Sequence, residues 1–381
     1  MRLRFVCLCP IHLVAAVFCW VSLNSPPVPA RAEDVRPDDR TTVAIEALKR
    51  LKDVDLESNP ALKGAVLKVL DQVRGTPQFV EIVREFQWKG QEPALLEYAL
   101  NNPNESSGVE AMRLVLAGGN LDPLKAALAG TNTLSALKVL GHASDNAVVP
   151  LIAPLLEDTR RDLPTRKEAA RALAKSRDGA KKLLNLAREE RLPAELKFIA
   201  STELNAAPWP EIKAEAAQVL PLPTVQNAEP LPPVSELVKR SGDSNRGAAL
   251  FRSPQIGCIN CHQVNGEGID FGPNLSEIGT KLGKDALYES ILDPNAGISF
   301  GYEGWQIELK NGDEVFGLIV SETAEEMAVK AQTGIVTRHK KSEVTRREQS
   351  KISVMPAGLQ ATMSTQGLVD LVEYLSSLKK K

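Results

Sequence analysis

The sequence predicts a mainly α-helical protein, in which a row of N-terminal helix pairs precedes a small helical region with an antiparallel β insertion. Two observations predict this fold class. Similar amphipathic segments recur before residue 220, and a run with strand-like alternation interrupts the helical pattern near the C-terminus. The chain has 381 residues, enough for two or three domains. Its formal net charge of −2 argues against a nucleic-acid partner.

Residues 1–32 read as a signal peptide. Two arginines precede a mostly apolar run over 5–23, and small residues around Ala32 offer a cleavage site. We therefore expect export, to the periplasm of a bacterium. A retained membrane anchor is the alternative, and membrane association is expected only in that case. Pro10 and His12 interrupt the apolar run, which favours cleavage.

Residues 33–220 are expected to form helical repeats. Similar segments begin at residues 110, 135, 168 and 198: EAMRLVLAGG, SALKVLGHAS, EAARALAKSR and FIASTELNAA. Second apolar helices accompany them, as in VVPLIAPLLED (148–158) and GAKKLLNLARE (179–189). A helix pair repeated at such intervals is typical of an α-solenoid, because each pair buries its apolar face on the next. The pattern resembles HEAT repeats, and an ordinary helical bundle is the alternative.

A proline-rich linker is predicted over 221–240, because proline blocks helix and favours extended chain. The last region, 241–381, opens with a helix for which Asp243 or Ser244 is the expected N-cap. The β insertion is expected at about 302–350, where Asn311-Gly312 marks a hairpin.

A second pair of strand-like runs surrounds Gly334, and an amphipathic helix is expected to close the chain.

The segment GCINCHQVNGEG places Cys258, Cys261 and His262 in one short turn. Cys258 and Cys261 are the only cysteines that remain after signal cleavage, so no disulfide framework is available. Cys-x-x-Cys-His is the attachment motif of c-type haem, in which the two sulfurs bind the macrocycle and the histidine faces the iron. A zinc site is one alternative, with His142 or His339 as a further ligand, and a redox dithiol is another.

The region around this turn resembles cytochromes c. Gly272-Pro273-Asn274-Leu275 follows the turn, and Met355-Pro356 precedes the last helix. The resemblance implies that the Pro273 carbonyl orients the His262 imidazole, that Leu275 packs on the haem ring and that Met355 is the second axial iron ligand.

The resemblance also implies that the first and last helices of this region cross, at Gly247 and Phe251 on one and Leu371 and Tyr374 on the other. From about 243 to 379, the chain more closely resembles a bacterial haem-binding domain family of c-type cytochromes. It carries the GPNLSEIG, ESILDPN, GYEGWQIELKNGDEVFG and MP segments of that family in order.

We therefore expect an exported c-type cytochrome with one covalently attached haem c. With histidine and methionine on the iron, the expected chemistry is one-electron transfer rather than catalysis by the chain itself. Members of the resembled family are often fused to a propeller-type dehydrogenase. This chain lacks that part, so we expect a redox partner protein in trans, with the helical repeats as its docking surface.

Other assignments stay open. Met363, Met327 and His339 are rival axial ligands. An iron without a sixth ligand would indicate a haem sensor or a peroxidase-like enzyme, and a chain without haem would be a helical-repeat scaffold. A basic group around Arg338 and Arg346 could dock an acidic partner, although such a run is usually a solvated face.

Overall fold

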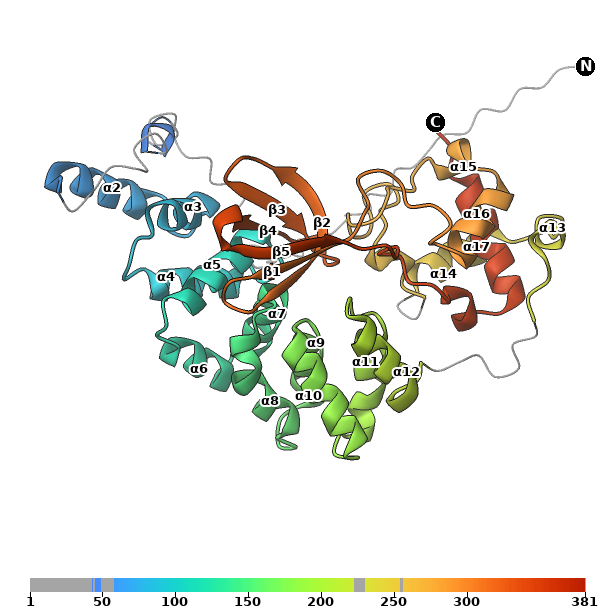
Figure 1. Cartoon of the computed structure of the whole chain (residues 1–381), viewed down its shortest axis with the longest axis horizontal. Helices are drawn as coiled ribbons and strands as arrows, with labels where there is room; N and C mark the ends of the chain where they lie inside the picture. Colours follow the sequence, from blue (N-terminus) through green and yellow to red (C-terminus); the bar gives the residue numbers. More distant parts are fainter. Residues whose placement is uncertain (1–42, 44, 49–57, 223–229, 254–255, 381) are drawn as a thin grey trace, which may run out of the picture. The chain divides into compact units, whose positions relative to one another are not determined.

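The computed structural model describes residues 43, 45–48, 58–222, 230–253 and 256–380. The predicted signal peptide and part of the predicted linker lie outside these residues. The described part is mainly helical, with one antiparallel sheet in its C-terminal third (Figure 1). The predicted fold class is therefore confirmed. No helix within the described residues is long and apolar enough to cross a membrane.

The helices before the linker follow one another in pairs (Figure 1). Their bounds are α2 Pro60–Gln72, α3 Pro77–Phe86, α4 Glu92–Asn101, α5 Ser106–Ala117, α6 Asp122–Ala129, α7 Thr133–Ala143, α8 Val149–Glu157, α9 Leu163–Ala174, α10 Arg177–Arg188, α11 Ala194–Asn205 and α12 Pro210–Val219. Most of them begin with proline in their first turn, where a missing N–H costs no helical hydrogen bond.

One row of these helices carries the four similar segments of the sequence. Helix α5 packs on α7, α7 on α9 and α9 on α11, while α4, α6, α8 and α10 pair with members of this row. Leucine, alanine and valine fill the spaces between helices, and at Gly141 the backbones come so close that a Cβ would lie 3.0 Å from Ala172 Cα. The spacing in the sequence thus corresponds to stacked helix pairs.

The C-terminal region begins and ends with helices. Its helices are α13 Val234–Leu237, α14 Ser244–Arg252, α15 Ile278–Lys281, α16 Lys284–Leu292 and α17 Thr365–Ser377. The carboxylate of Asp243 accepts from the amides of Asn245 and Arg246, so Asp243 is the N-cap of α14.

Helices α14 and α17 cross closely. A Cβ on Gly247 would lie 2.0 Å from the carbonyl oxygen of Asp370, so only glycine fits at this point. The rings of Phe251 and Tyr374 meet with centroids 5.8 Å apart, and Leu371 is buried beside them. The positions that the resemblance implies on α14 and α17 therefore do lie where these two helices cross.

The sheet has five antiparallel strands in the order β4-β3-β2-β1-β5. They are β1 Trp305–Leu309, β2 Glu314–Glu322, β3 Glu326–Lys330, β4 Val336–Lys340 and β5 Val344–Gln349. The two expected hairpin turns contain Gly312 at φ +87° and Gly334 at φ +81°, a conformation that glycine adopts without strain. Strand β5, which pairs with β1, lies within the predicted insertion, although its polar sequence VTRREQ did not single it out as a strand.

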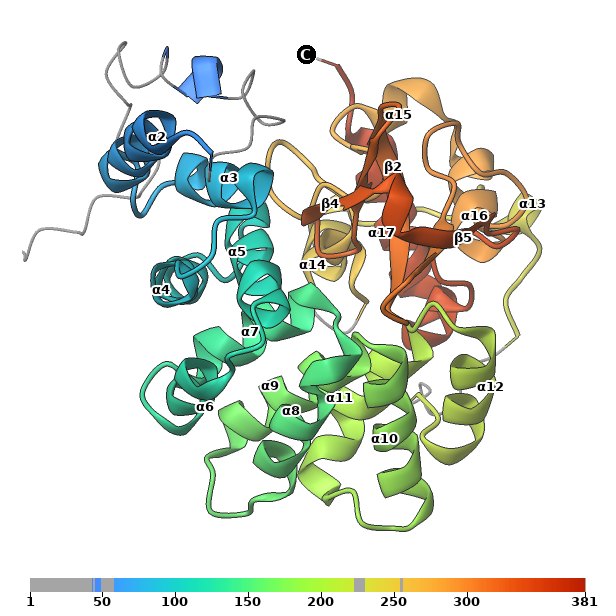
Figure 2. The same ribbon diagram turned by 60° about the vertical axis from the view of Figure 1, so that its left-hand side comes forward.

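Strand β4 of the sheet contacts helix α5. Figure 2 shows the sheet and the paired helices from a second side. Arg84 of α3 donates to Glu326 of β3 at 2.6 Å, and Arg177 of α10 donates to Glu314 of β2 at 2.5 Å. Ile335, in the β3–β4 turn, is 4% exposed and packs within the apolar core of the helices. Residues 37–381 group as one unit by their contacts, and the predicted boundary between a repeat domain and a C-terminal domain stays a prediction.

Candidate functional site

The cysteine turn follows helix α14 and is built on backbone hydrogen bonds. Gly257 enters it at φ +78°, and a 3-10 turn then spans Cys258–Asn260. The amides of Cys261 and His262 both donate to the Cys258 carbonyl, at 3.1 and 2.9 Å. The turn therefore fixes the two thiols and the imidazole on one short, closed piece of chain.

His262 is held by the segment that the Gly-Pro motif predicted. Its Nδ1 lies 2.7 Å from the Pro273 carbonyl oxygen and donates to it in the neutral tautomer. A Cβ on Gly272 would lie 2.6 Å from His262 Cε1, so the imidazole rests against glycine backbone. Burial lowers the pKa of His262, although the Pro273 bond opposes this. The ring is thus neutral at pH 7, and the lone pair of Nε2 can bind a metal.

A ladder of backbone bonds ties this segment to the turn. The amides of Phe271 and Gly272 donate to the Cys261 carbonyl, and the amide of Leu275 donates to the Gln263 carbonyl at 2.9 Å. Leu275 lies half-buried against the apolar core beneath α17. The predicted supporting residues Gly272, Pro273 and Leu275 are therefore brought to His262.

The two thiols are unpaired and half-buried. Burial raises the pKa of Cys258 to about 11, and burial also raises that of Cys261. A hydrogen bond from Gln332 and the positive charge of Lys175 oppose this rise in the pKa of Cys261. Both thiols are consequently protonated at neutral pH.

Of the candidate methionines, Met355 lies on a loop beside the same core. Its side chain is half-buried against the cluster that also borders Cys258 and Leu275. Met363 is 6% exposed within that cluster, and Met327 is buried in the separate core of the sheet. Met355 is thus a partly accessible thioether that borders the same core as the turn, whereas Met327 is buried between the strands.

The two candidate zinc ligands among the histidines lie on β4 and near the end of α7. His339 on β4 is buried, with Nε2 2.8 Å from Thr337 Oγ1 and Nδ1 3.4 Å from Arg113. His142 ends α7, half-buried, and burial lowers its pKa to about 4. Among the described residues, no three histidine, cysteine, aspartate or glutamate side chains gather as a metal site. The zinc alternative therefore has no support in the geometry.

Gln332 is a neighbour of the site that the motifs did not reveal. Its Nε2 lies 3.7 Å from Cys261 Sγ, within range of a hydrogen bond to sulfur. It comes from the turn between β3 and β4, 71 residues along the chain. A lone glutamine in a turn carries no sequence signal of a site.

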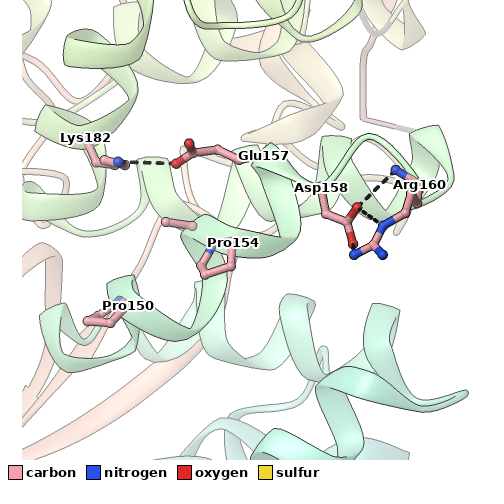
Figure 3. A pocket seen from close by; sticks show the side chains of 7 residues that line it. Pro150, Pro154, Glu157, Asp158, Arg160 and Lys182 are labelled. Carbon is pink, nitrogen blue, oxygen red and sulfur yellow. Dashed lines mark hydrogen bonds and ion pairs between the residues drawn. The ribbon is translucent and has the colours of Figure 1, made fainter.

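Two other surface features are an ion-paired basic group and a hollow at α8. In the basic group, Lys341 and Arg347 both pair with Glu322, and Arg346 pairs with Glu308. A hollow of about 690 Å³ lies at α8 (Figure 3). It is lined by Pro150, Ala153, Pro154, Glu157, Asp158, Arg160 and Lys182. Its charges pair with each other, Glu157 with Lys182 and Asp158 with Arg160.

Residues 244–311 match the protein-family model described as cytochrome c. The match spans helix α14, the cysteine turn, the Gly-Pro segment and β1, and it ends before Met355. A search of curated proteins gives no match to the chain. A cytochrome c domain implies covalently bound haem c and supports a haem-binding electron-transfer protein. The residues of the turn fit a haem group, because they offer two free thiols and a neutral imidazole whose Nδ1 is already hydrogen-bonded.

Proposed function

We propose that the chain is an exported c-type cytochrome that carries one haem and passes single electrons to and from a partner protein. The observation that carries this proposal is the setting of His262. Its Nδ1–H donates to the Pro273 carbonyl and its ring rests on Gly272, directly after two unpaired thiols. Such a second bond fixes the tautomer and makes the free nitrogen a better metal ligand.

Cys258 and Cys261 would hold the cofactor covalently. The two thiols would hold the group through thioether bonds, without net oxidation or reduction. Both thiols are unpaired, so both are available for this attachment. Bound there, haem iron supplies reversible one-electron chemistry. His262 Nε2 would be one axial ligand.

Met355 would be the second protein ligand of the haem iron. Its half-buried position beside the core that borders Cys258 supports this assignment over Met327. A saturated iron leaves no position for a substrate, so the role of the chain is to bury the cofactor and present it to a partner in trans. The paired helices, which resemble HEAT repeats, would be the docking surface for that partner.

The test is an optical spectrum of the full chain, expressed with a haem-attachment system and then denatured in acid. We expect a c-type spectrum that survives denaturation, with a far-red methionine-to-iron band when oxidised. Cys261→Ser should abolish normal double attachment. Met355→Ala should remove the far-red band and lower the reduction potential, while Met327→Ala serves as control.

Each contrary result points to a specific alternative. Covalent haem without the far-red band would indicate a five-coordinate sensor or a peroxidase-like enzyme. A chain without any haem would be a helical-repeat scaffold, and the electron-transfer proposal would be wrong.

A further inference from the structure

The turn between β3 and β4, residues 331–335, and the last residue of β3 reach the haem-attachment region at three points. Gln332 Nε2 lies 3.7 Å from Cys261 Sγ. A Cβ on Gly334 would lie 3.0 Å from Ile269 Cγ2, so the turn sits directly on the loop that follows the cysteines. At the end of β3, Lys330 Nζ pairs with Asp270 at 2.8 Å. The β insertion therefore covers the Cys261 side of the attachment turn.

The same turn is fixed from its other side. Ile335 is buried in the apolar core of the paired helices, and the amide of Val336 donates to Ser106 Oγ on α5 at 2.9 Å. Gln332 thus approaches Cys261 from a turn with contacts on two sides. A side chain so placed keeps its distance to the sulfur, and it can exert a fixed electrostatic effect.

A second polar group of the turn lies next to Gln332 in the chain. Thr333 Oγ1 is buried and has no hydrogen-bond partner among the described residues. A buried hydroxyl without a partner is destabilising, so such groups are commonly satisfied when the site is complete. Gln332 and Thr333 together give the turn a polar character beside a sulfur that is itself half-buried.

We propose that the β3–β4 turn is a wall of the haem site, which closes the Cys261 side of the cofactor and tunes its reduction potential through the carboxamide of Gln332. This inference rests on the proposed function and deepens it, because it gives the β insertion a role in the site. An N–H dipole that points toward the haem stabilises the reduced, less positive state. Gln332 accordingly holds the potential higher than an apolar residue would.

The experiment places charge at Gln332 in the full haem-loaded chain. Covalent haem is first measured in the unsubstituted protein, and the reduction potential is then titrated spectroelectrochemically. Gln332→Lys should raise the potential and Gln332→Glu should lower it, because a charge a few ångströms from the haem in a poorly solvated site acts strongly. Proton resonances of the haem substituent at Cys261 should shift in both variants.

Gln349 provides the matched control, since it is an exposed glutamine on β5 at the opposite edge of the sheet. Gln349→Lys and Gln349→Glu should leave the potential and the resonances nearly unchanged. If the Gln332 variants move the potential no more than the Gln349 variants do, the inference is wrong although the chain still carries haem. If the unsubstituted protein carries no covalent haem, the proposed function fails and the inference fails with it.

Discussion

The imidazole of His262 is positioned by backbone on two sides. The Pro273 carbonyl accepts from Nδ1, and Gly272 leaves room for the ring edge, so neither contact depends on a flexible side chain. Backbone partners fix a ligand more rigidly than side chains do, because they lose little entropy when they are ordered. The remaining nitrogen is therefore presented in one direction.

Gly272→Ala tests this arrangement. The new Cβ would lie 2.6 Å from His262 Cε1, so the ring must move or the segment must shift, at a cost of about 1–3 kcal/mol. We expect less covalent haem per chain and a lower unfolding temperature. Gly297→Ala is the control, since a Cβ there meets no atom within 4 Å. Equal haem content in both variants would show that the glycine does not position the imidazole.

Asp370 on α17 gives a second prediction, in the pH dependence of stability. Hydrogen bonds from Arg246 lower the pKa of Asp370 to about 2, and a further bond comes from the Asp243 amide at 2.8 Å. A carboxyl with a depressed folded-state pKa stabilises the fold above its unfolded value of about 3.9. This contribution is lost as the pH falls through about 2.

Asp370→Asn should therefore lower stability by about 1–2 kcal/mol at pH 7, a modest figure because Arg246 is 60% exposed. The difference from the unsubstituted chain should shrink between about pH 4 and pH 2. Thermal unfolding across this range measures it, with the exposed Asp285→Asn as control. A difference independent of pH would mean that the ion pair contributes nothing.

Much of the site at this scale was predictable from the sequence, and Gln332 shows where prediction ended. Two cysteines, a histidine and a Gly-Pro pair lie within sixteen residues, so chemistry and chain geometry together predict their association. Gln332 reaches Cys261 only through the folding of the β insertion. Its contact depends on strand pairing and on packing against the helices, which a single sequence does not encode in a readable motif.

At the scale of elements, the crossing of α14 and α17 organises the C-terminal region. Gly247→Ala should destabilise it by about 1–3 kcal/mol, because the added Cβ would overlap the Asp370 carbonyl. Gly64→Ala is the matched variant in helix α2, where a Cβ meets nothing within 4 Å. It should instead stabilise the chain by about 0.5–1 kcal/mol, because alanine favours helix. Denaturant unfolding measures both, and the same sign for the two variants would contradict the prediction.

The elements differ in how readable they were from sequence. The paired helices and α17 show clear apolar periodicity, and the Asn-Gly and Gly334 turns mark hairpins, so these were expected correctly. Strand β5 lies within the predicted insertion but was not singled out, because its residues are nearly all exposed and half of them are charged. It forms a strand because it pairs with β1, for example with Arg347 opposite Ile307. Its own sequence shows no strand pattern.

At the scale of the whole molecule, the sheet joins the helices before the linker to the residues around the cysteine turn. Glu314 of β2 accepts from Arg177 and from the indole N–H of Trp209, and the Asn146 amide donates to Asp313 at 3.1 Å. These polar contacts link residues more than a hundred positions apart. No periodicity or motif predicts them, because each partner looks like an ordinary surface residue until both regions are folded.

The apolar anchor of this junction is Ile335, and its truncation provides the last prediction. Ile335→Ala removes a side chain that is 4% exposed among the helices, at an expected cost of about 2–4 kcal/mol. Amide hydrogen exchange should rise in both β4 and α5, because the Val336–Ser106 bond loses its support. Ile352→Ala, at a position 54% exposed, should change neither stability nor exchange. Faster exchange in β4 alone would mean that α5 does not depend on the sheet, and that the helices and the sheet open independently.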